Sequence, residues 1–523
     1  MANSSCTSYS CRNMKDFYNK LCLLLLEEFF GSIVQCIGNS LLYGTKTLRA
    51  ICFGTSLPVA KVKEGLCVLI KHGFVTYQRN EEEVEYTIYQ DKIIMILRYP
   101  RYILFAKTHC GDEGEIMLEE VLKHGYITAS EVIIKTYKRI EQTPSRFNYL
   151  NVFSAAEPSI PNLKDVFELL VKNQFLMRSL SFEATRDALK PDYNLPNLDL
   201  IAISSVLKGQ NTELSDNTIY WKVNFDRLTE DLRDQILISA TTQRFDKNAG
   251  ELMKHMINLM YCRTASWAAT SNPIPYTEIK EEVKKSNYEE LEHFLDQYLR
   301  LIEEDSTQFI RRVGDSGGGQ YILNMKNAFK QLTWATVEHI VTERFDSKAA
   351  RIFRLIRNEI DVNLDQIQTL AMFPAKDAKS ITYALSQENY IQTQELKKSG
   401  TLSAPTKLTK ASPPYRFCID LTKIVEMETE HCYQALYNII TRRDHESTNN
   451  KRLIEKQLRV QILSANLREH GATEQQLADI AEMITPSEIQ QLERAQNAIK
   501  KLAAAELQVD ETLFLFSMYV MYH

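Results

Sequence analysis

The chain has 523 residues, of which 44% are hydrophobic and 25% are charged, a composition typical of globular proteins with packed cores. A domain usually has about 100–200 residues, so we expect several domains. The formal net charge of -5 argues against a free-standing DNA-binding protein, because such proteins are usually basic. Any contact with nucleic acid is therefore expected to be local, auxiliary or made within a larger assembly.

The cysteines and the apolar runs narrow the protein class further. None of the ten cysteines forms a C-x-x-C pair, so we expect no zinc ribbon, no other metal site and no cofactor. Cys22, Cys52 and Cys67 lie in apolar stretches, where free thiols behave as small hydrophobic groups, so we expect a reducing compartment, the cytosol or the nucleus. The longest apolar runs, at 21–26 and 513–521, are much shorter than the roughly 20 residues of a membrane span. We expect a soluble, unsecreted protein without membrane contact.

The first of four similar segments begins at Pro58, which suits the first turn of a helix. An apolar stripe with helical spacing follows, and Gly73 is a good helix stop. The stripe consists of Val62, Leu66, Leu69 and Ile70. A strand is expected over 74–77, a turn over 80–83 and a return strand of alternating faces over 84–89. Two helices are expected upstream, over 17–42 and 48–53.

The same order recurs three times. The second copy opens at Pro161, with strands expected over 175–178 and, after a long polar insertion, over 218–225. The third has a stripe formed by Leu291, Phe294, Leu295, Tyr298 and Leu299. Its strands are expected over 309–312 and 321–323, around a glycine-rich turn at 314–319. The fourth opens at Pro374 and carries Ala378, Ile381 and Leu385, with strands over 390–393 and 417–419 and a long loop over 397–414.

Three helices followed by strand, turn and strand is the order of a winged helix, a variant of the helix-turn-helix. The predicted fold class is mainly α with small β-hairpins (α+β), in which four tandem winged-helix domains precede a C-terminal helical hairpin. The predicted segments are a flexible N-terminus over 1–20, winged helices over 21–110, 111–228, 229–325 and 326–421, and a hairpin over 422–523.

The last hundred residues carry helical patterns only. One stripe consists of Ile454, Leu458, Ile462 and Ala465. Thr485, Pro486 and Glu488 form a strong helix start, with a capping box. The heptad positions that follow are candidates for a partner interface and consist of Leu492, Ala495, Ile499 and Leu502. We predict an antiparallel hairpin or coiled coil that breaks near Gly471 and packs on the body or on a partner.

Several stretches resemble one family. They are 97–102 (LRYPRY), 224–228 (NFDRL), 314–319 (GDSGGG), 344–355 (RFDSKAARIFRL), 374–379 (PAKDAK) and 509–512 (VDET). Together they resemble the family that supplies the largest member of the dissociable winged-helix trimer of DNA-directed RNA polymerase III. The resemblance runs from about residue 21 to the end of the chain.

The resemblance implies four extended winged helices with a C-terminal coiled coil, similar to the large subunit of transcription factor E. It also implies a nuclear, non-catalytic subunit in a subcomplex on the polymerase clamp. Such a subunit acts in promoter recruitment, DNA opening and initiation of small-RNA (tRNA and 5S rRNA) transcription. The implied partners are the winged-helix and acidic-tailed subunits of the trimer, other polymerase subunits, initiation factors and promoter DNA. An iron–sulfur cluster, if present in the subcomplex, would belong to a partner.

Basic residues on the third helices and wings are candidates for DNA contact, because a winged helix presents that helix to the duplex. The first copy offers Lys61, Lys63, Lys71 and Arg79, and the fourth offers Lys376, Lys379, Lys397 and Lys398. The third copy is acidic, with Glu289, Glu290, Glu292 and Asp296. The competing interpretation is that the lysines form a solvated face or contact proteins. A scaffold or adaptor of another nuclear complex, without DNA contact, is then the alternative function.

Two other motifs have competing interpretations. The GDSGG motif around Ser316 matches the nucleophile loop of trypsin-like proteases, and His109 lies upstream as a possible base. A glycine-rich turn between two strands is favoured instead, because glycine adopts positive φ freely and the intervening chain is mostly helical by pattern. The cluster of Arg98, Tyr99, Arg101 and Tyr102 could stack on nucleic acid, but a domain junction is the favoured interpretation.

Overall fold

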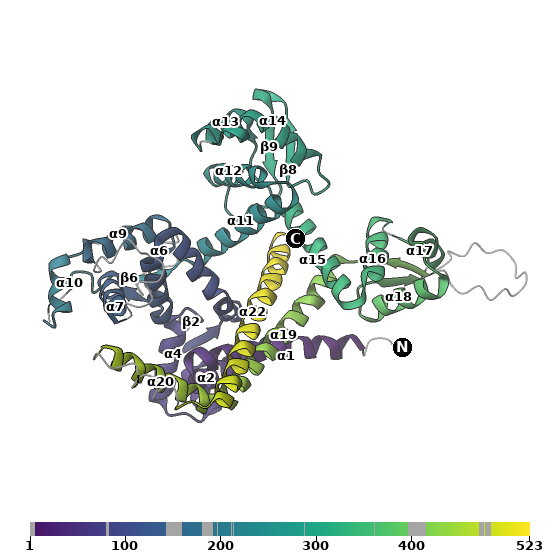
Figure 1. Cartoon of the computed structure of the whole chain (residues 1–523). Coiled ribbons are helices and arrows are strands. Elements are labelled where there is room, and N and C mark those ends of the chain that lie inside the picture. Colours follow the sequence, from purple (N-terminus) through teal and green to yellow (C-terminus); the bar gives the residue numbers. More distant parts are fainter. Residues whose placement is uncertain are drawn as a thin grey trace, which may run out of the picture. The chain divides into compact units, whose positions relative to one another are not determined.

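The computed structural model describes residues 6–79, 83–142, 159–179, 192–195, 197–210, 212, 214–286, 288–359, 361–395, 415–469, 475 and 483–523. The chain divides into two compact units, Met1–Arg233 and Asp234–His523. Small sheets and many helices confirm the predicted fold class, with two winged helices in each unit and the helical hairpin in the second (Figure 1). No helix in the described part of the chain is long and apolar enough to cross a membrane.

The first winged helix follows a long N-terminal helix. Its elements are α1 (Cys6–Phe30), α2 (Ser32–Leu42), β1 (Lys46–Thr47), α3 (Leu48–Thr55), α4 (Val59–Lys71), β2 (Val75–Arg79) and β3 (Val84–Ile88). Gly31 has a φ of 88° and divides the single helix expected over 17–42. Residues 6–20 belong to α1, and the flexible segment expected over 1–20 stays a prediction. The apolar positions that begin at Leu21 continue a helix that has already started upstream.

The second winged helix shares the first unit. Its elements are α5 (Gln90–Ile94), η1 (Met95–Arg98), α6 (Tyr99–His124), β4 (Ile127–Thr128), α7 (Ala129–Gln142), α9 (Ile160–Lys172), β5 (Leu176–Arg178), α10 (Leu200–Leu207) and β6 (Tyr220–Val223). In its core, the rings of Phe167 and Trp221 pack edge to face, with their centroids 5.6 Å apart. The insertion contains α10, which was not predicted. Asp199 caps this helix by accepting hydrogen bonds from the backbone N–H groups of Ile201 and Ala202.

The third winged helix is preceded by α11 (Phe225–Arg244). Its elements are α12 (Lys247–Arg263), β7 (Ile274–Pro275), α13 (Tyr276–Lys285), α14 (Glu289–Glu304), β8 (Ile310–Gly314), η2 (Ser316–Gly318) and β9 (Gln320–Leu323). The core stripe of α14 uses Leu291, Leu295, Leu299 and Ile302. Phe294 was predicted to belong to this stripe, but its side chain is 50% exposed. Position 294 lies at the flank of the stripe formed by the four buried residues, and the backbone of α14 also departs from helical geometry there.

The fourth winged helix is preceded by α15 (Met325–Phe345). Its elements are α16 (Ser347–Glu359), α17 (Leu364–Ala371), α18 (Ala375–Gln387), β10 (Gln392–Glu395) and β11 (Tyr415–Cys418). The strand expected over 390–393 begins two residues later, at Gln392, because the backbone N–H of Tyr390 still bonds to the carbonyl of Leu385 at the end of α18. The loop expected over 397–414 lies outside the described residues.

Each winged helix contains a short strand segment that the predicted order lacked. It precedes the domain's second helix and pairs with the return strand, giving the sheet orders β1-β3-β2, β4-β6-β5 and β7-β9-β8. In the fourth domain it is a single bridge from Val362 to Phe417. Segments of one or two residues are too short to show an alternating pattern, so the sequence alone could not reveal them.

The hairpin is formed by α19 (Leu421–Asn449), α20 (Lys451–Glu469) and α22 (Pro486–Tyr522). Contacts of Thr422 with Tyr519 and of Asn450 with Gln491 show that α19 and α22 run antiparallel. The capping box predicted at Thr485 and Glu488 is present. The stripe that starts at Ile454 was predicted to form an arm of the hairpin. In the structure α20 contacts α22, with Lys456 Nζ 2.8 Å from Glu488 and the amide of Gln496 donating to Gln457 at 2.9 Å. Helix α19 supplies a longer packed partner of α22, and much of the α20 stripe stays exposed.

Candidate DNA-contact and partner-contact surfaces

Helix α4 is the third helix of the first winged helix, the position that faces DNA in this fold. It packs Val62, Leu66 and Leu69 into the core and leaves its lysines exposed. Lys61, Lys63 and Lys71 are all exposed, and Lys71 lies opposite the buried stripe. Arg79 is exposed at the end of β2. Within the described residues none of these cations forms an ion pair, so their charge is available to a ligand.

Helix α3 adds groups that were not selected from the sequence. It packs against α4 and exposes Arg49. Phe53 on the same helix is 92% exposed, an unusual position for a large aromatic side chain. The sequence signal was weak, because an apolar residue in a short helix is normally expected in the core. An exposed aromatic next to basic residues suits stacking or protein contact.

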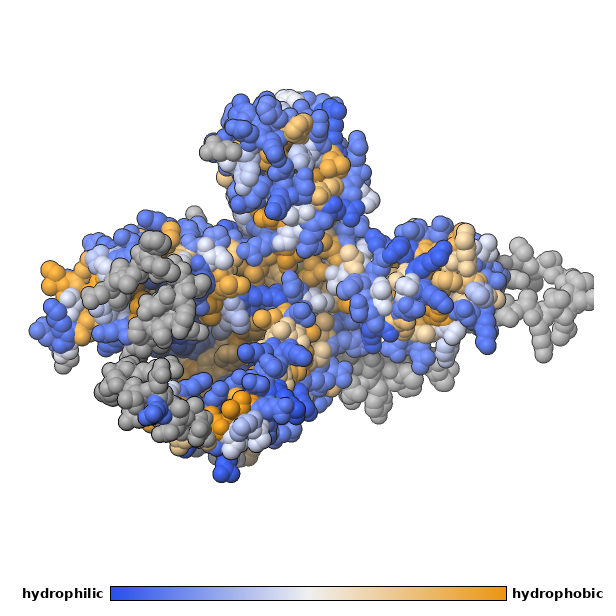
Figure 2. All heavy atoms as spheres, in the orientation of Figure 1, coloured by the Kyte–Doolittle hydropathy of each residue, from blue (hydrophilic) through white to orange (hydrophobic). Residues whose placement is uncertain are grey.

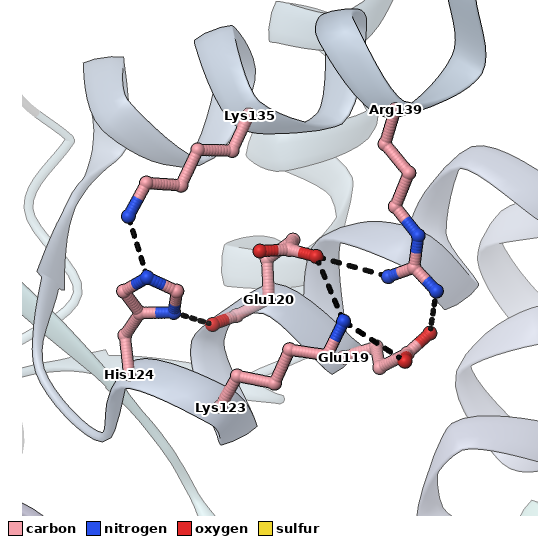
Figure 3. Close-up of polar contacts among 6 residues, drawn as sticks. All are labelled: Glu119, Glu120, Lys123, His124, Lys135 and Arg139. Carbon is pink, nitrogen blue, oxygen red and sulfur yellow. Dashed lines mark hydrogen bonds and ion pairs between the residues drawn. The ribbon is translucent and has the colours of Figure 1, made fainter. Parts of the chain in front are cut away.

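Several cations of the second winged helix are paired with carboxylates of the same domain. On α9, Lys164 and Lys172 lie 3.6 and 3.9 Å from the carboxylate of Glu168. Between α6 and α7, the guanidinium of Arg139 donates to Glu119 at 2.8 Å and to Glu120 at 2.9 Å (Figure 3). These bonds join the first two helices of the domain and leave little positive charge for a duplex.

The same network includes Lys123, whose ammonium lies 3.2 Å from both carboxylates (Figure 3). Burial raises the pKa of Glu119, but hydrogen bonds from Arg139 and Lys123 outweigh it and hold that pKa below its usual range. Nearby, the ammonium of Lys135 lies 2.6 Å from Nε2 of His124. The figure shows these side chains facing one another between the two helices. The network therefore serves the domain's own structure.

The third winged helix presents an acidic third helix, as predicted. The first turn of α14 carries Glu289, Glu290 and Glu292. Lys284 lies 3.5 Å from Glu292, which offsets only part of this charge. A duplex would meet repulsion here, because its phosphates are negative.

The GDSGG segment is the wing of the third domain. Gly317, Gly318 and Gly319 all have positive φ, and Ser316 Oγ accepts a hydrogen bond from Gln320 at 2.9 Å. His109 lies on α6 in the other unit, where its ring packs against Phe105. The segment thus has the geometry of a turn, which favours that interpretation over a nucleophile loop.

The fourth winged helix exposes Lys376 and Lys379 on α18. With Tyr383 they share one helical face, because the three positions follow the spacing of 3 and 4 residues. This face borders a groove of about 740 Å³. Lys397 and Lys398 lie outside the described residues.

The aromatic and basic cluster at 98–102 lies at the junction of the first two domains. Arg98 is 8% exposed and Tyr102 is fully buried. Tyr99 stacks on Phe225 with ring centroids 5.7 Å apart. Tyr102 Oη lies 3.0 Å from the hydroxyl of Thr229. Burial favours the junction interpretation over stacking on nucleic acid.

The heptad residues of α22 differ in their exposure. Leu492 and Ala495 are 4% and 5% exposed, so they serve packing inside the chain. Ile499 and Leu502 are half-buried. The more deeply buried stretch of α22 runs from Leu513 to Tyr522 and packs against α15 as well as α19. No cluster of three or more His, Cys, Asp or Glu side chains in the described segments could hold a metal ion.

Comparison with known proteins identifies relatives along almost the whole chain. Residues 20–80 match the RNA polymerase III subunit RPC82 helix-turn-helix domain, and residues 168–332 match RNA polymerase III subunit RPC82. Residues 337–409 match the POLR3C C-terminal winged-helix domain, and residues 452–515 match the helical hairpin domain of DNA-directed RNA polymerase III subunit RPC3.

Curated relatives cover the same range. The chain is 35% identical over 536 aligned positions to DNA-directed RNA polymerase III subunit RPC3 of Bos taurus, covering 96% of this chain and 98% of the relative. It is 34% identical to the Homo sapiens protein of that name with the same coverage. The Dictyostelium discoideum protein is 22% identical, over 47% of this chain and 38% of its own length.

Proposed function

The chain belongs to the family of DNA-directed RNA polymerase III subunit RPC3, and from that premise we propose that it is a non-catalytic subunit of nuclear RNA polymerase III. The observation that carries this proposal is the similarity across 96% of the chain and 98% of the bovine relative. Coverage of that extent includes all four winged helices and the hairpin. The partners are then the other subunits of the polymerase.

In finer detail, the chain acts at initiation. It helps to bring the polymerase to promoters of small-RNA genes, such as those for tRNA and 5S rRNA, and to open the DNA there. It does so within a winged-helix subcomplex on the clamp, together with a winged-helix subunit, an acidic-tailed subunit and initiation factors. The net charge of -5 supports an auxiliary role, because a chain of this balance binds DNA only where cations are concentrated.

The first winged helix is the proposed DNA-contact domain. Lys61, Lys63 and Lys71 on α4 and Arg79 on β2 are exposed. No carboxylate in the described part of the chain pairs with them, unlike Arg139 and Lys123 of the second domain. Lysine contacts to phosphates position a protein without reading sequence. The domain is therefore suited to holding DNA that other factors have selected.

A second candidate is a winged-helix adaptor that makes only protein contacts. The acidic α14 and the paired lysines of α9 favour this role for the second and third domains. Many winged helices act as docking modules, since fold alone does not fix function. The two candidates differ in whether the lysines of α4 contribute to promoter opening.

Reconstitution separates them. Polymerase stripped of this subunit is reloaded with the wild type, with a Lys61→Glu/Lys63→Glu/Lys71→Glu variant, or with a Lys348→Glu control on the exposed start of α16. Permanganate reactivity of promoter thymines then reports strand opening. We expect the triple variant to assemble normally but to open the promoter at least about tenfold less, while the control matches the wild type. Equal opening by all three would favour the adaptor.

A further inference from the structure

The third helix and the wing strands of the fourth winged helix enclose an apolar groove. The lysine-bearing face of α18 forms one wall, and β10 with β11 and the start of α17 form the other. The lining includes Leu364, Lys376, Lys379, Tyr383, Tyr415 and Phe417. At about 740 Å³ the groove falls within the roughly 300–1,000 Å³ typical of pockets that enclose a ligand.

The groove exposes more apolar surface than a solvated helix face would. Tyr383 is 70% exposed and Tyr415 is 44% exposed, on opposite walls. Leu370 on the neighbouring α17 is 51% exposed. Figure 2 shows hydrophobic residues reaching the surface over α17 and α18. Contiguous exposed apolar side chains bordered by charge mark interaction sites on soluble proteins.

The charges at the rim are of one sign. Lys376 and Lys379 stand one turn apart on the wall formed by α18. Across the described ranges, neither ammonium forms an ion pair with a carboxylate. The connection between β10 and β11, residues 396–414, contains four lysines and no acidic residue. The sequence that joins the two strands is therefore also basic, which favours an acidic occupant over a basic one.

An acidic peptide with an apolar anchor fits both features. Its carboxylates would lie against the two lysines, and an aromatic or leucine side chain would fill the space between Tyr383 and Phe417. A DNA duplex matches only the lysines, because phosphates and base edges need polar partners and leave the apolar lining unfilled. We propose that this groove binds an acidic peptide segment of a partner protein, anchored by a large apolar side chain.

The test uses the full chain and a fluorescein-labelled peptide in which one tryptophan is flanked by aspartates and glutamates. Two control peptides replace the tryptophan with serine, or the acidic residues with lysines. A labelled DNA duplex of the same formal charge is titrated in parallel. Fluorescence anisotropy gives the dissociation constant for each probe. Repeating the titration at rising salt concentration shows how much of the binding free energy is electrostatic.

Three variants locate the binding. Lys376→Glu/Lys379→Glu removes the charge of the rim, Tyr383→Ser removes an apolar wall, and Lys348→Glu is the matched control outside the groove. These side chains are exposed, so folding should be unaffected, which thermal unfolding checks. We expect the acidic tryptophan peptide to bind, and to bind at least about tenfold more weakly to both groove variants, which is about 1.4 kcal/mol.

Two results would overturn the proposal. One is binding of the duplex alone, lost in the double lysine variant and unchanged in Tyr383→Ser, which would assign the face to nucleic acid. The other is binding of neither probe, or peptide binding that both groove variants retain. Because the assay needs only the isolated chain, its failure would leave membership in the polymerase untouched, and failure of the polymerase assignment would leave the groove proposal standing.

Discussion

Arg344 on α15 and Glu428 on α19 form an ion pair of 3.4 Å although 84 residues separate them in sequence. The hydroxyl of Tyr390, from the core of the fourth winged helix, donates to the same carboxylate and accepts from Arg344 at 2.8 Å. Burial raises the pKa of Glu428, but hydrogen bonds from His431 and Tyr390 outweigh it and lower that pKa overall. The cluster therefore stabilises the contact between the fourth winged helix and α19 of the hairpin.

Replacing Glu428 with alanine should therefore destabilise the second unit. Only 5% of the Glu428 side chain is exposed, and its loss leaves Tyr390 and part of Arg344 without their acceptor. We expect the free energy of unfolding to fall by about 2–4 kcal/mol. Urea unfolding followed by circular dichroism measures the change. Glu388→Gln is the control, because Glu388 is 45% exposed and 3.7 Å from Arg344, and its change should stay below about 1 kcal/mol. Equal effects of the two would refute the role of the cluster.

Gly125 sets the contact between the first two winged helices. Its φ is +71°, and a Cβ at that position would lie 2.5 Å from the carbonyl oxygen of Lys71. Gly125→Ala should cost roughly 2–4 kcal/mol, from backbone strain together with the clash. Gly209→Ala is a matched control, because its φ is +85° with no atom within 4 Å, and it should cost only about 1 kcal/mol. If both variants lose equal stability, the close approach at Lys71 does not matter.

His72 makes the same junction sensitive to acid. Burial, with smaller contributions from Lys71 and His124, lowers the pKa of His72 from 6.5 to about 4. The folded state favours the neutral ring, so its stabilising contribution is complete above pH 6.5 and is lost as the pH falls towards 4. His72→Phe keeps the aromatic contacts with Phe30 and Phe74 but cannot titrate.

Unfolding midpoints measured between pH 7 and pH 4 test this. The expected result is a shallower loss of stability in His72→Phe than in the wild type over that window. Parallel curves for the two proteins would mean that another group carries the acid sensitivity.

The hairpin should respond to charge according to burial. Leu492→Asp places a carboxylate at a position that is 4% exposed, and we expect a loss of about 3 kcal/mol or more. Ile499→Asp, at a half-buried position, should cost less. Leu458→Asp on the exposed stripe of α20, which is 55% exposed, should change stability by less than about 1 kcal/mol. Helicity and unfolding midpoints rank the three variants by their loss of stability. Any other ranking would contradict the assignment of α19 and α22 as the packed pair.

Sequence patterns predicted the repeated units because each third helix has an apolar stripe and is followed by an aromatic-led strand, with a good helix stop at Gly73 in the first copy. They also predicted the capping box at Thr485, since that signal is local. The larger contact of α22 with α19 was not predicted, because the stripe that starts at Ile454 has helical spacing whether or not anything packs on it. Periodicity shows that a helix has an apolar face, but not which element covers that face.

For the candidate surfaces, the sequence located the basic residues but could not show which of them are paired with carboxylates. Arg139 and Lys123 are as basic in sequence as Lys61 and Lys63, yet only the structure shows the former pair held by carboxylates. The groove of the fourth winged helix was also hidden, because Tyr383 and Phe417 come from elements that meet only in the fold. Ion pairs between distant residues and the walls of a groove depend on tertiary contacts, which cannot be inferred from the pattern of a single sequence.

The central claim is that this chain is an RNA polymerase III subunit, and affinity purification of the tagged full-length protein from nuclear extract tests it most directly. Quantitative mass spectrometry of the co-purified proteins gives their proportions. The account predicts RNA polymerase III subunits in near-equal amounts with the tagged chain. Recovery of unrelated proteins, with polymerase subunits no more abundant than in an untagged control, would contradict it.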